Sequence, residues 1–591
     1  MRHFADTIAQ ALSVLTGLAP AEIKIEEPRD RAMGDLAFPC FALAKAQKKA
    51  PPAIAAELAS ALGGKLQGIT AVATGPYINF QVERTLLART VVGAVEAGGT
   101  RYGRSDLGRG KTIVIDFSSP NIAKPMHVGH LRSTILGQAL VNLHEALGYR
   151  TVGINHIGDW GSMFGGLVVA MKRWGGARVG ADGKVVLDRA KELGIDIEGD
   201  PVRGLLEVYQ RSKKVLDPER PEHDAAFAAE ARDAWRELES GKDGEIRALW
   251  RWVTEVSMRG FSRTYQRLGI RHDLVRGESF YEPFLAPTFE RCEKAGITEI
   301  SDGATIVALK AIDKGLAETP CLLKQRDGTT LYATRDLAAL YHRWDEFHFE
   351  RCLYVVGAEQ KLHFRQLKAV LKRLGADFEP RVEHVDFGLL LGTGRTKLAS
   401  RKGDVLVLDE LLDEVVEETS RVVREKNPEL AGQQQIAEQI GIGALVFNDL
   451  KRERIKDVVF DKAEVLSFEG ETGPYVQYTH ARMASILRKA QASGQGNAAP
   501  DWSALTEAAP VLVRLSQFPD VVRSAAEHAE PSELAQALLA LSRDLSTWYV
   551  GNRVLDQEPP VTAARLALVR SCKTVLANGL RLLGVAAPEE M

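Results

Sequence analysis

The chain has 591 residues, which is too long for one hydrophobic core, so about three or four domains are expected. With 45% hydrophobic and 26% charged residues, the composition is that of folded protein and excludes a mostly disordered chain. The formal net charge of −2 excludes a protein that is basic overall, although binding a nucleic acid needs only a local basic face.

The cysteines are scattered, odd in number and form no Cys-x-x-Cys pair, so we expect buried thiols rather than a disulfide framework or a zinc site. They are Cys40, Cys292, Cys321, Cys352 and Cys572. No apolar run approaches the roughly 20 residues that cross a bilayer, so no membrane partner is expected. Asp6 and Gln10 interrupt what could pass for a signal peptide, and we expect a cytoplasmic protein.

Residues 1–100 are predicted to form a small α+β domain. Helical spacing of apolar residues alternates there with a short strand signal at residues 75–80. The stretch 98–110 that follows is rich in glycine and charge, which is typical of a linker between domains.

A different pattern begins at Thr112. Residues 112–117 are apolar on both faces, which is typical of a strand buried in a parallel sheet. Further strand candidates are residues 151–157, 353–356 and 382–391. Helical stretches separate these strands, so the fold class is predicted as α/β with a doubly wound parallel sheet, split by a mostly helical insertion at about 172–265.

From about residue 408 onward the sequence has helical spacing almost throughout. One break is the stretch 494–501, which is rich in glycine, alanine and proline and is predicted to be a loop. The C-terminal part of the chain is therefore predicted to be all-α, with a connecting region at 406–470 and a helical domain at 471–591.

The segment 118–130 follows the first buried strand and precedes a predicted helix at 131–147. A strand, a tight turn and a helix N-terminus bring backbone N–H groups and a positive dipole end to the sheet edge where phosphates bind. Gly129 lets a ligand approach the backbone closely. His127 and His130 can donate hydrogen bonds to the charge that grows on ATP phosphates. Taken alone, this pair is equally compatible with a metal site or a polar helix start.

A second cluster of cations, flanked by glycines, follows the last strand candidate at residues 392–403. Its sequence is Gly-Thr-Gly-Arg-Thr-Lys-Leu-Ala-Ser-Arg-Lys-Gly. Such a loop could close over ATP phosphates, and a solvated basic turn is the plain alternative.

Acidic side chains near strand ends are candidates for binding a cationic substrate. The segments are residues 276–279, 331–336 and 357–360. Tyr332 and Asp336 are four residues apart and therefore share one helical face. Each acid alone is more simply explained as a surface or helix-capping residue.

The tetrapeptide His127-Val128-Gly129-His130 resembles the His-Ile-Gly-His signature of the class I aminoacyl-tRNA synthetases. The longer string from residue 118 to 134 resembles the form found in the arginyl-tRNA synthetase family, and the resemblance covers nearly the whole chain. It implies a Rossmann-like catalytic domain at 110–405, ATP and Mg²⁺ as the cofactors, with Mg²⁺ carried by ATP, and no dedicated metal site in the protein.

The cation loop resembles the second class I signature, Lys-Met-Ser-Lys-Ser. Lys397 matches it, but Ala399 replaces a serine and Ser400 stands where the second lysine belongs. Lys124 could supply the missing charge, and so could Arg401 or Lys402. The catalytic and ATP-binding residues that the resemblance implies are His127, Gly129, His130, Lys124, Lys397, Ser400 and Arg401.

A guanidinium pocket needs carboxylates, because planar bidentate pairing gives both strength and geometry. By resemblance, Glu278, Tyr332 and Asp336 face the guanidinium of arginine. Asn155 and Gln360 are the implied partners of the α-amino group, and Asn121 helps to orient the substrate. The insertion, at about 90 residues, is too short for a full editing domain, and a guanidinium pocket needs none.

The C-terminal part resembles an anticodon-binding domain, and the N-terminal part resembles one that meets the outer corner of tRNA. Exposed aromatics and cations can stack on bases and hold phosphates, although core packing is the plain alternative for most of them. The tRNA-binding candidates are Tyr475, Tyr478, Trp548, Asn552, Arg553 and Met591. The expected partners are tRNA(Arg), L-arginine and ATP, with the chain acting as a monomer.

Two alternatives stay open. A class I synthetase for glutamate should present an arginine where this chain has Glu278 and Asp336, and one for cysteine would favour zinc ligands. A non-catalytic tRNA-binding paralogue is the second alternative, and the intact His127, His130 and Lys397 argue against it.

Overall fold

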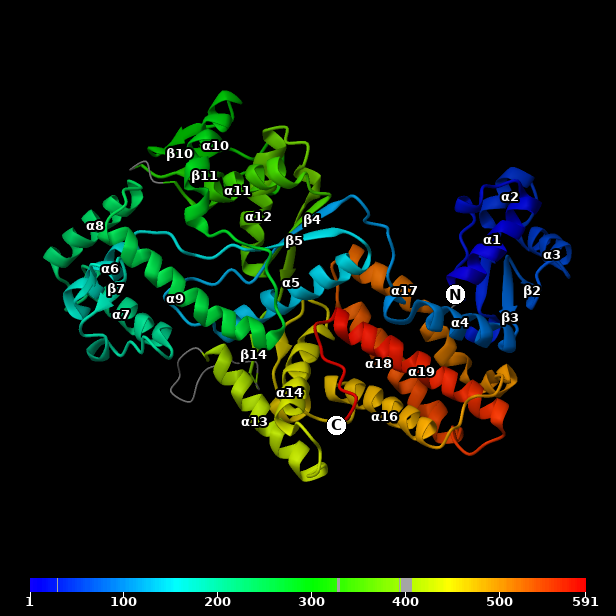
Figure 1. Ribbon diagram of the computed structural model, residues 1–591. Helices are drawn as coiled ribbons and strands as arrows, with labels where there is room; N and C mark the ends of the chain where they lie inside the picture. The colour runs from blue at the N-terminus through cyan, green and yellow to red at the C-terminus, as the bar shows by residue number, and fades with distance from the viewer. Residues whose placement is uncertain (29, 327–329, 393, 395–405) are drawn as a thin grey trace.

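The computed structural model describes residues 1–591 except 29, 327–329, 393 and 395–405. Its N-terminal domain is a three-stranded antiparallel sheet with the strand order β1-β3-β2, packed against helices (Figure 1). The strands are β1 (Leu36–Pro39), β2 (Ile69–Thr74) and β3 (Tyr77–Val82), and the helices are α1 (Arg2–Thr16), α2 (Phe41–Gln47), α3 (Pro51–Leu62) and α4 (Arg84–Gly98). In α1, Phe4, Ile8 and Leu12 are buried on one face, as their helical spacing requires.

The next region is built on a five-stranded parallel sheet with the order β13-β12-β4-β5-β8. Its strands are β4 (Thr112–Asp116), β5 (Arg150–Asn155), β8 (Leu274–Val275), β12 (Arg351–Gly357) and β13 (Val382–Phe387). From β4 the chain first adds strands on one side and later returns to add β12 and β13 on the other. Ligands bind at such a reversal of strand order, at the carboxyl ends of the strands.

Helices cover both faces of this sheet. In β4, Ile113 and Ile115 belong to the core that includes α5 (Val128–Ala146), whereas Val114 belongs to the core that includes α11 (Tyr332–Phe347) and α12 (Lys361–Arg373). A strand that is buried on both faces needs apolar residues at successive positions. This explains why β4 shows no alternation of polar and apolar residues.

The insertion lies between β5 and β8, at the end of the molecule farthest from the N-terminal domain (Figure 1). It contains α6 (Met163–Gly175), the hairpin of β6 (Ala177–Val179) and β7 (Val185–Leu187), α7 (Pro201–Leu216), α8 (Ala225–Glu239) and α9 (Glu245–Leu268). Between β8 and α11 lie α10 (Glu282–Lys294) and a small antiparallel sheet of β9 (Glu299–Ser301), β10 (Ala304–Val307) and β11 (Cys321–Lys324).

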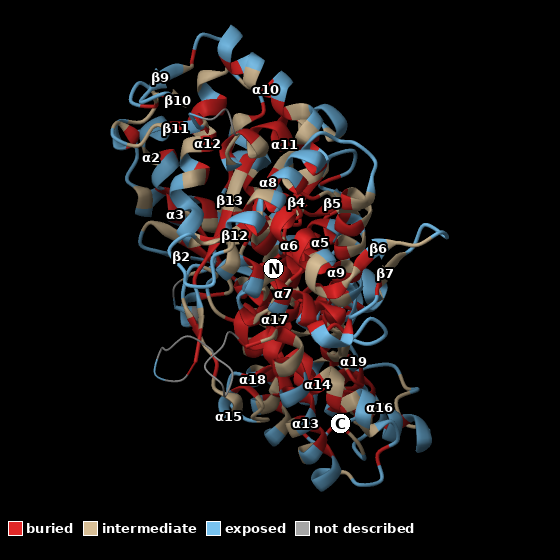
Figure 2. Cartoon of the chain, turned by 90° about the vertical axis from the view of Figure 1, so that its left-hand side faces the viewer, coloured by how far each residue is buried: buried red, intermediate tan, exposed pale blue. Residues whose placement is uncertain are grey.

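After β13, the elements of the described residues are helices except for a short parallel pair, β14 (Leu390–Leu391) with β15 (Val458–Val459). The connecting helices are α13 (Leu408–Lys426), α14 (Gln433–Leu450) and α15 (Lys462–Val465). The C-terminal bundle consists of α16 (Gly473–Ala492), α17 (Ala509–Glu527), α18 (Ser532–Gly551) and α19 (Pro559–Leu582). Helix α4 of the N-terminal domain packs against α17 and α19, and buried residues concentrate in the central sheet, α5 and the bundle (Figure 2).

The predicted fold class is confirmed, including the doubly wound parallel sheet, the α+β N-terminal part and the helical C-terminal part. Two predicted boundaries are wrong. The helix expected from residue 131 begins at Val128, because His127 caps it. The strand expected at 382–391 breaks after Phe387, because the N–H of Gly388 donates to the carbonyl of Arg454 (3.0 Å) instead of continuing the ladder.

None of the described helices is long and apolar enough to cross a bilayer. All five cysteines are buried and free, as predicted.

Candidate active site

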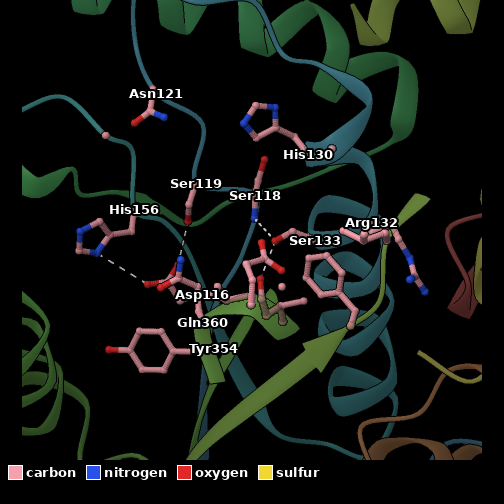
Figure 3. A pocket seen from close by; sticks show the side chains of 18 of the residues that line it. Asp116, Ser118, Ser119, Asn121, His130, Arg132, Ser133, His156, Tyr354 and Gln360 are labelled. Atoms are coloured by element: carbon pink, nitrogen blue, oxygen red, sulfur yellow. Dashed lines mark hydrogen bonds and ion pairs between the residues drawn. The ribbon is translucent and has the colours of Figure 1, made fainter. Parts of the chain in front are cut away.

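A cavity of about 870 Å³ opens at the carboxyl ends of β4 and β12, at the turn that precedes α5 (Figure 3). It lies where the order of the strands reverses, as the topology predicts. Eight of the residues predicted from the sequence line it: Asn121, His127, Gly129, His130, Glu278, Tyr332, Asp336 and Gln360. The structure therefore brings the predicted phosphate-binding and arginine-binding residues into one cavity.

The turn between β4 and α5 has an unusual backbone. Ser118, Ser119 and Ala123 have φ angles of 76°, 49° and 61°, a region that costs about 1–3 kcal/mol for a non-glycine residue. Hydrogen bonds hold this conformation: the N–H of Ser118 donates to Ser133 Oγ (2.9 Å), and the N–H of Ala123 donates to Ser257 Oγ (2.9 Å). The turn is thus fixed by the surrounding protein without a ligand.

The two histidines at the start of α5 are held as neutral hydrogen-bond donors. His127 Nδ1 accepts from the N–H of Gly129 (3.1 Å), and His130 Nδ1 accepts from the N–H of His127 (3.1 Å). Burial, with nearby Lys124, lowers the pKa of His127, and burial, with His127, lowers the pKa of His130 to about 3. A neutral imidazole whose Nδ1 accepts carries its proton on Nε2. Each ring can therefore offer an Nε2–H to a phosphate oxygen.

Close approach of the backbone is needed at two glycines of the cavity. A Cβ on Gly129 would lie 2.8 Å from His127 Cε1 and would displace the imidazole. A Cβ on Gly158 would collide with the Oδ1 of Asn121, whose backbone pairs with Gly158 as an isolated bridge. Asn121 is exposed and lines the cavity, so its predicted contact with the substrate is sterically open.

Carboxylates give the cavity a local negative charge. Burial raises the pKa of Glu278 to about 7, against the effect of nearby Arg335 and with the help of Asp336 and other neighbouring acids. Asp336 accepts a hydrogen bond from His363 Nε2 (2.6 Å). Tyr332, the first residue of α11, lies one turn before Asp336 and is 68% exposed. A cationic ligand would stabilise the ionised form of Glu278 and pair with both acids.

Asn155 is fully buried and is not among the residues that line the cavity. Its Nδ2 donates to the hydroxyl of Tyr265 (3.1 Å), which is also bonded to Ser118 Oγ (2.8 Å). The Oδ1 of Asn155 has no hydrogen-bond partner among the described residues. Asn155 therefore supports the strained turn, and its predicted contact with the α-amino group stays a prediction.

Lys124 is the predicted substitute for the missing lysine of the second signature. Its Nζ lies 4.5 Å from the centroid of the Tyr209 ring, on helix α7 of the insertion. A cation over an aromatic face is a favourable contact. In this structure the ammonium of Lys124 thus binds the insertion, and its predicted contact with ATP stays a prediction.

Sequence reasoning missed Asp159, which fixes the segment that carries Glu278. The buried carboxylate of Asp159 accepts from the N–H (2.9 Å) and the Oγ (2.6 Å) of Ser279. A Cβ on Gly277 would collide with the same carboxylate. In addition, Trp250 Nε1 of α9 donates to the carbonyl of Asp159 (2.8 Å), which ties the insertion to the cavity. An acid four residues after the buried strand β5 is the sequence signal for this role.

Arg343 is a second functional candidate that the sequence analysis did not single out. It is fully buried on α11, and its Nη2 donates to Asp116 Oδ2 (2.6 Å) and lies 3.2 Å from His156 Nδ1. Asp116 and His156 line the cavity (Figure 3). Arg343 stands seven residues after Asp336, on the same helical face, so helical spacing alone could have identified it.

The second signature falls largely outside the described residues, which leaves out Lys397, Ser400, Arg401 and Lys402. The residues directly after the second signature are hydrogen-bonded to the histidine turn. The N–H of Val128 donates to the carbonyl of Leu406 (3.1 Å), and the N–H of Leu408 donates to the carbonyl of Met126 (2.9 Å). Backbone hydrogen bonds thus join the histidine turn to residues 406–408, which follow the second signature in the chain.

Among the tRNA-binding candidates, Tyr475 and Tyr478 line a small cavity of about 60 Å³ in the C-terminal bundle. Tyr478 is exposed, and the guanidinium of nearby Arg482 lies 4.2 Å from the ring centroid of Tyr549. Aromatic rings and a cation at the surface can stack on an unpaired base.

The other candidates in the C-terminal part are less available to a nucleic acid. Trp548 and Asn552 are buried in the bundle, and Asn552 Nδ2 donates to the carbonyl of Trp548 (3.0 Å), which favours a packing role. Arg553 is exposed and pairs with Asp556 (2.7 Å). Met591 is partly buried against a small cluster of α13 and α14.

Among the described residues, no group of three or more His, Cys, Asp or Glu side chains could hold a metal ion. The donors at the histidine turn are N–H groups, which suit an anion rather than a metal.

Comparison with known proteins gives three matches to family models. They are "tRNA synthetases class I (R), catalytic domain" over residues 93–462, "DALR anticodon binding domain" over 476–591 and "Arginyl tRNA synthetase N terminal domain" over 2–82. The arginine–tRNA ligase of Exiguobacterium sibiricum is 43% identical over 589 residues, covering 99% of each chain. That of Ligilactobacillus salivarius is 41% identical over 592 residues, again covering 99% of each chain.

Among solved structures, the arginyl-tRNA synthetase of Thermus thermophilus superimposes with a TM-score of 0.79 at 27% identity, covering 100% of both chains. The class I catalytic-domain match, on a parallel sheet that has two histidines at the start of α5, identifies the chain as a class I aminoacyl-tRNA synthetase. The amino acid is arginine, because two findings agree on it. They are the catalytic-domain match, which spans more than half of the chain, and the relatives above 40% identity. The chain belongs to the arginyl-tRNA synthetase family and is a ligase that makes arginyl-tRNA.

Proposed function

We propose that the cavity binds L-arginine and ATP side by side, forms arginyl-adenylate, and passes the arginyl group to the 3′ end of tRNA(Arg). The observation that carries this proposal is that Glu278 and Asp336 line the same cavity as His127 and His130. The acids can pair with a guanidinium, and the imidazole N–H groups can donate hydrogen bonds to phosphate oxygens. The chain is proposed to act as a monomer in the cytoplasm.

In the first step, an oxygen of the arginine carboxylate attacks the α-phosphorus of ATP, and the bond to pyrophosphate breaks. Negative charge then grows on the phosphate oxygens. The Nε2–H groups of His127 and His130, together with the N-terminus of α5, stabilise that charge without reorganising, because both rings are already fixed. Mg²⁺ would arrive with ATP and neutralise part of the phosphate charge.

The arginine pocket is proposed to consist of Glu278, Asp336 and Tyr332 for the guanidinium. Gln360 and Asn155 are proposed as partners of the α-amino group, and Asn121 orients the substrate. A glutamate pocket would need a cation among the residues that face the side chain, whereas Glu278 and Asp336 are acids and His363 is already bonded to Asp336. The chemistry of the pocket thus favours arginine over glutamate.

In the second step, a ribose hydroxyl of the tRNA 3′ end attacks the carbonyl carbon of the adenylate, and AMP leaves. We propose that the C-terminal bundle and the N-terminal domain hold the tRNA while this happens. The exposed Tyr478 beside Arg482 supports base stacking on the bundle.

An aminoacylation assay tests the proposed function. The purified chain is incubated with ATP, unfractionated tRNA and each of the twenty amino acids in turn. Arginine alone should be attached to tRNA. Attachment of another amino acid would overturn the pocket assignment, and tRNA binding without any attachment would identify a non-catalytic paralogue.

A further inference from the structure

Arg132 connects the histidine helix to a distant part of the chain. It lies two residues after His130 on α5, points away from the His130 ring (Figure 3), and is almost fully buried. Its Nε donates to Asp449 Oδ1 (3.2 Å), its Nη1 to the carbonyl of Lys456 (3.0 Å) and its Nη2 to the carbonyl of Arg454 (3.2 Å). One guanidinium is therefore hydrogen-bonded to three residues within 449–457. We name residues 449–457 the junction segment.

This attachment is stiff because both charges of the ion pair are buried. Asp449, near the end of α14, is 2% exposed, and Arg132 is 1% exposed. Separating the two groups would leave an unpaired charge without water, which is strongly unfavourable. Helix α5 and the junction segment are therefore expected to move together rather than apart.

The junction segment also holds the chain that leaves β13. The carbonyl of Arg454 accepts from the N–H of Gly388 (3.0 Å). The Nη1 of the Arg454 side chain donates to Asp386 Oδ1 (2.6 Å). The N–H of Leu389 donates to Asp457 Oδ1 (2.9 Å). Gly388 and Leu389 line the active-site cavity and lead into the second signature. A single residue, Arg454, thus contacts both Arg132 of α5 and Gly388 of the chain after β13.

The same residue is bonded to the C-terminal bundle. The backbone N–H of Arg454 donates to Glu530 Oε1 (3.2 Å) and Oε2 (3.3 Å), and Glu530 lies in the turn between α17 and α18. Ser532 Oγ also donates to Glu530 Oε1 (2.8 Å), so the carboxylate is held at the start of α18. A displacement of this turn would act directly on the backbone of Arg454.

We propose that Glu530 and Arg454 are positioning residues that transmit the docking of tRNA on the C-terminal bundle to the histidine helix and to the chain after β13. The proposal rests on the proposed function, in which the bundle binds tRNA. The route runs from Glu530 to the N–H of Arg454, and from the carbonyl of Arg454 to Arg132 and Gly388. Neither Glu530 nor Arg454 needs to touch arginine, ATP or tRNA for this role.

The test compares Glu530→Ala with the matched variant Glu533→Ala. Glu533 lies three residues after Glu530, in the first turn of α18, and its carboxylate pairs with His528 (2.8 Å) instead of the junction segment. The rate of a single turnover of arginine attachment is measured at saturating tRNA, and the Kd for tRNA is measured separately. For Glu530→Ala the rate should fall roughly 3- to 30-fold, the range expected for coupling through packed networks, with Kd changed less than about 2-fold. Glu533→Ala should match the wild type in both measurements.

Glu530→Gln gives a graded readout that a purely structural role would not predict. The amide oxygen still accepts from the N–H of Arg454, so most of the lost rate should return, and the melting temperature should stay near that of the wild type. This variant also replaces Glu530→Ala if the latter does not fold at the assay temperature, with an expected rate loss of about 2-fold.

Three results would overturn the proposal. They are an unchanged rate in both Glu530 variants, an equal rate loss in Glu533→Ala, and a rate loss that disappears once weaker tRNA binding is taken into account. These outcomes are distinct from failure of the proposed function. In that case the wild-type chain itself would not attach arginine to tRNA.

Discussion

The pH dependence of arginine binding tests the role of Glu278 in the pocket. Burial raises the pKa of this carboxyl to about 7, with Arg335 opposing the shift and nearby acids adding to it. The guanidinium of arginine stays charged throughout the accessible pH range and pairs with the ionised carboxylate. Bound arginine therefore favours loss of the proton from Glu278. Arginine binding should accordingly tighten as the pH rises through 7.

The expected size of the effect follows from the pKa. With a pKa of about 7, roughly 9% of Glu278 is ionised at pH 6 and roughly 91% at pH 8. If arginine binds only the ionised form, the apparent Kd should fall about 10-fold between these two pH values. At pH 7, binding should release about half a proton for each arginine bound.

Isothermal titration calorimetry in buffers of different ionisation enthalpy measures both quantities. Glu278→Gln should weaken binding at pH 8 by roughly 10- to 100-fold, because a charge-assisted pair is lost, and should remove most of the pH dependence. Some slope should remain from His363: burial lowers its pKa, but the hydrogen bond to Asp336 and the negative charge of Asp336 together raise it above its usual value. A wild-type Kd that is flat from pH 6 to pH 8, or an equal slope in Glu278→Gln, would refute this reasoning.

Four further outcomes are expected. Asp336→Asn should raise the KM for arginine at least ~10-fold in steady-state aminoacylation, and an unchanged KM would mean that the wrong acid was chosen. Lys124→Ala should lower kcat for adenylate formation more than Lys402→Ala, and equal or reversed effects in pyrophosphate exchange would reject Lys124 as the substitute cation. Asp159→Ala should raise the KM for arginine about 10-fold and leave the KM for ATP within about 2-fold, because it frees the segment that carries Glu278; similar changes in both constants would contradict this. Pyrophosphate exchange should require tRNA, and full-speed exchange without it would contradict the family resemblance.

The parts of the fold that the sequence predicted are those set by local patterns. Apolar residues on both faces of 112–117 indicated a strand buried on both faces, and helical spacing after residue 408 indicated the all-α part. The short strand β8, with two residues, pairs with β5 although the whole helical insertion separates them in sequence, and it has too few residues to show a pattern. Its existence depends on tertiary contacts, which no local window contains.

The same distinction applies to the site. His127 and His130 were found because a strand, turn and helix start are adjacent in sequence. Arg132, two residues later, was not singled out, because its partners Asp449 and Lys456 lie more than 300 residues away. Trp548 was predicted as a tRNA contact from its residue type, but only the packed bundle reveals that it is buried. Residue type alone can name candidate binding residues, whereas the folded structure is needed to tell which of them are exposed enough to bind.

The central position of β4 has a consequence for synthesis on the ribosome. One neighbour, β5, follows β4 closely, but the other, β12, begins about 235 residues after β4 ends. At a synthesis rate of about 5–20 residues per second, one edge of β4 stays unpaired for on the order of ten to fifty seconds until β12 has been made. An apolar strand with an open edge can pair with another chain during that time. The nascent chain should therefore depend on chaperones most strongly before residue 357 has emerged.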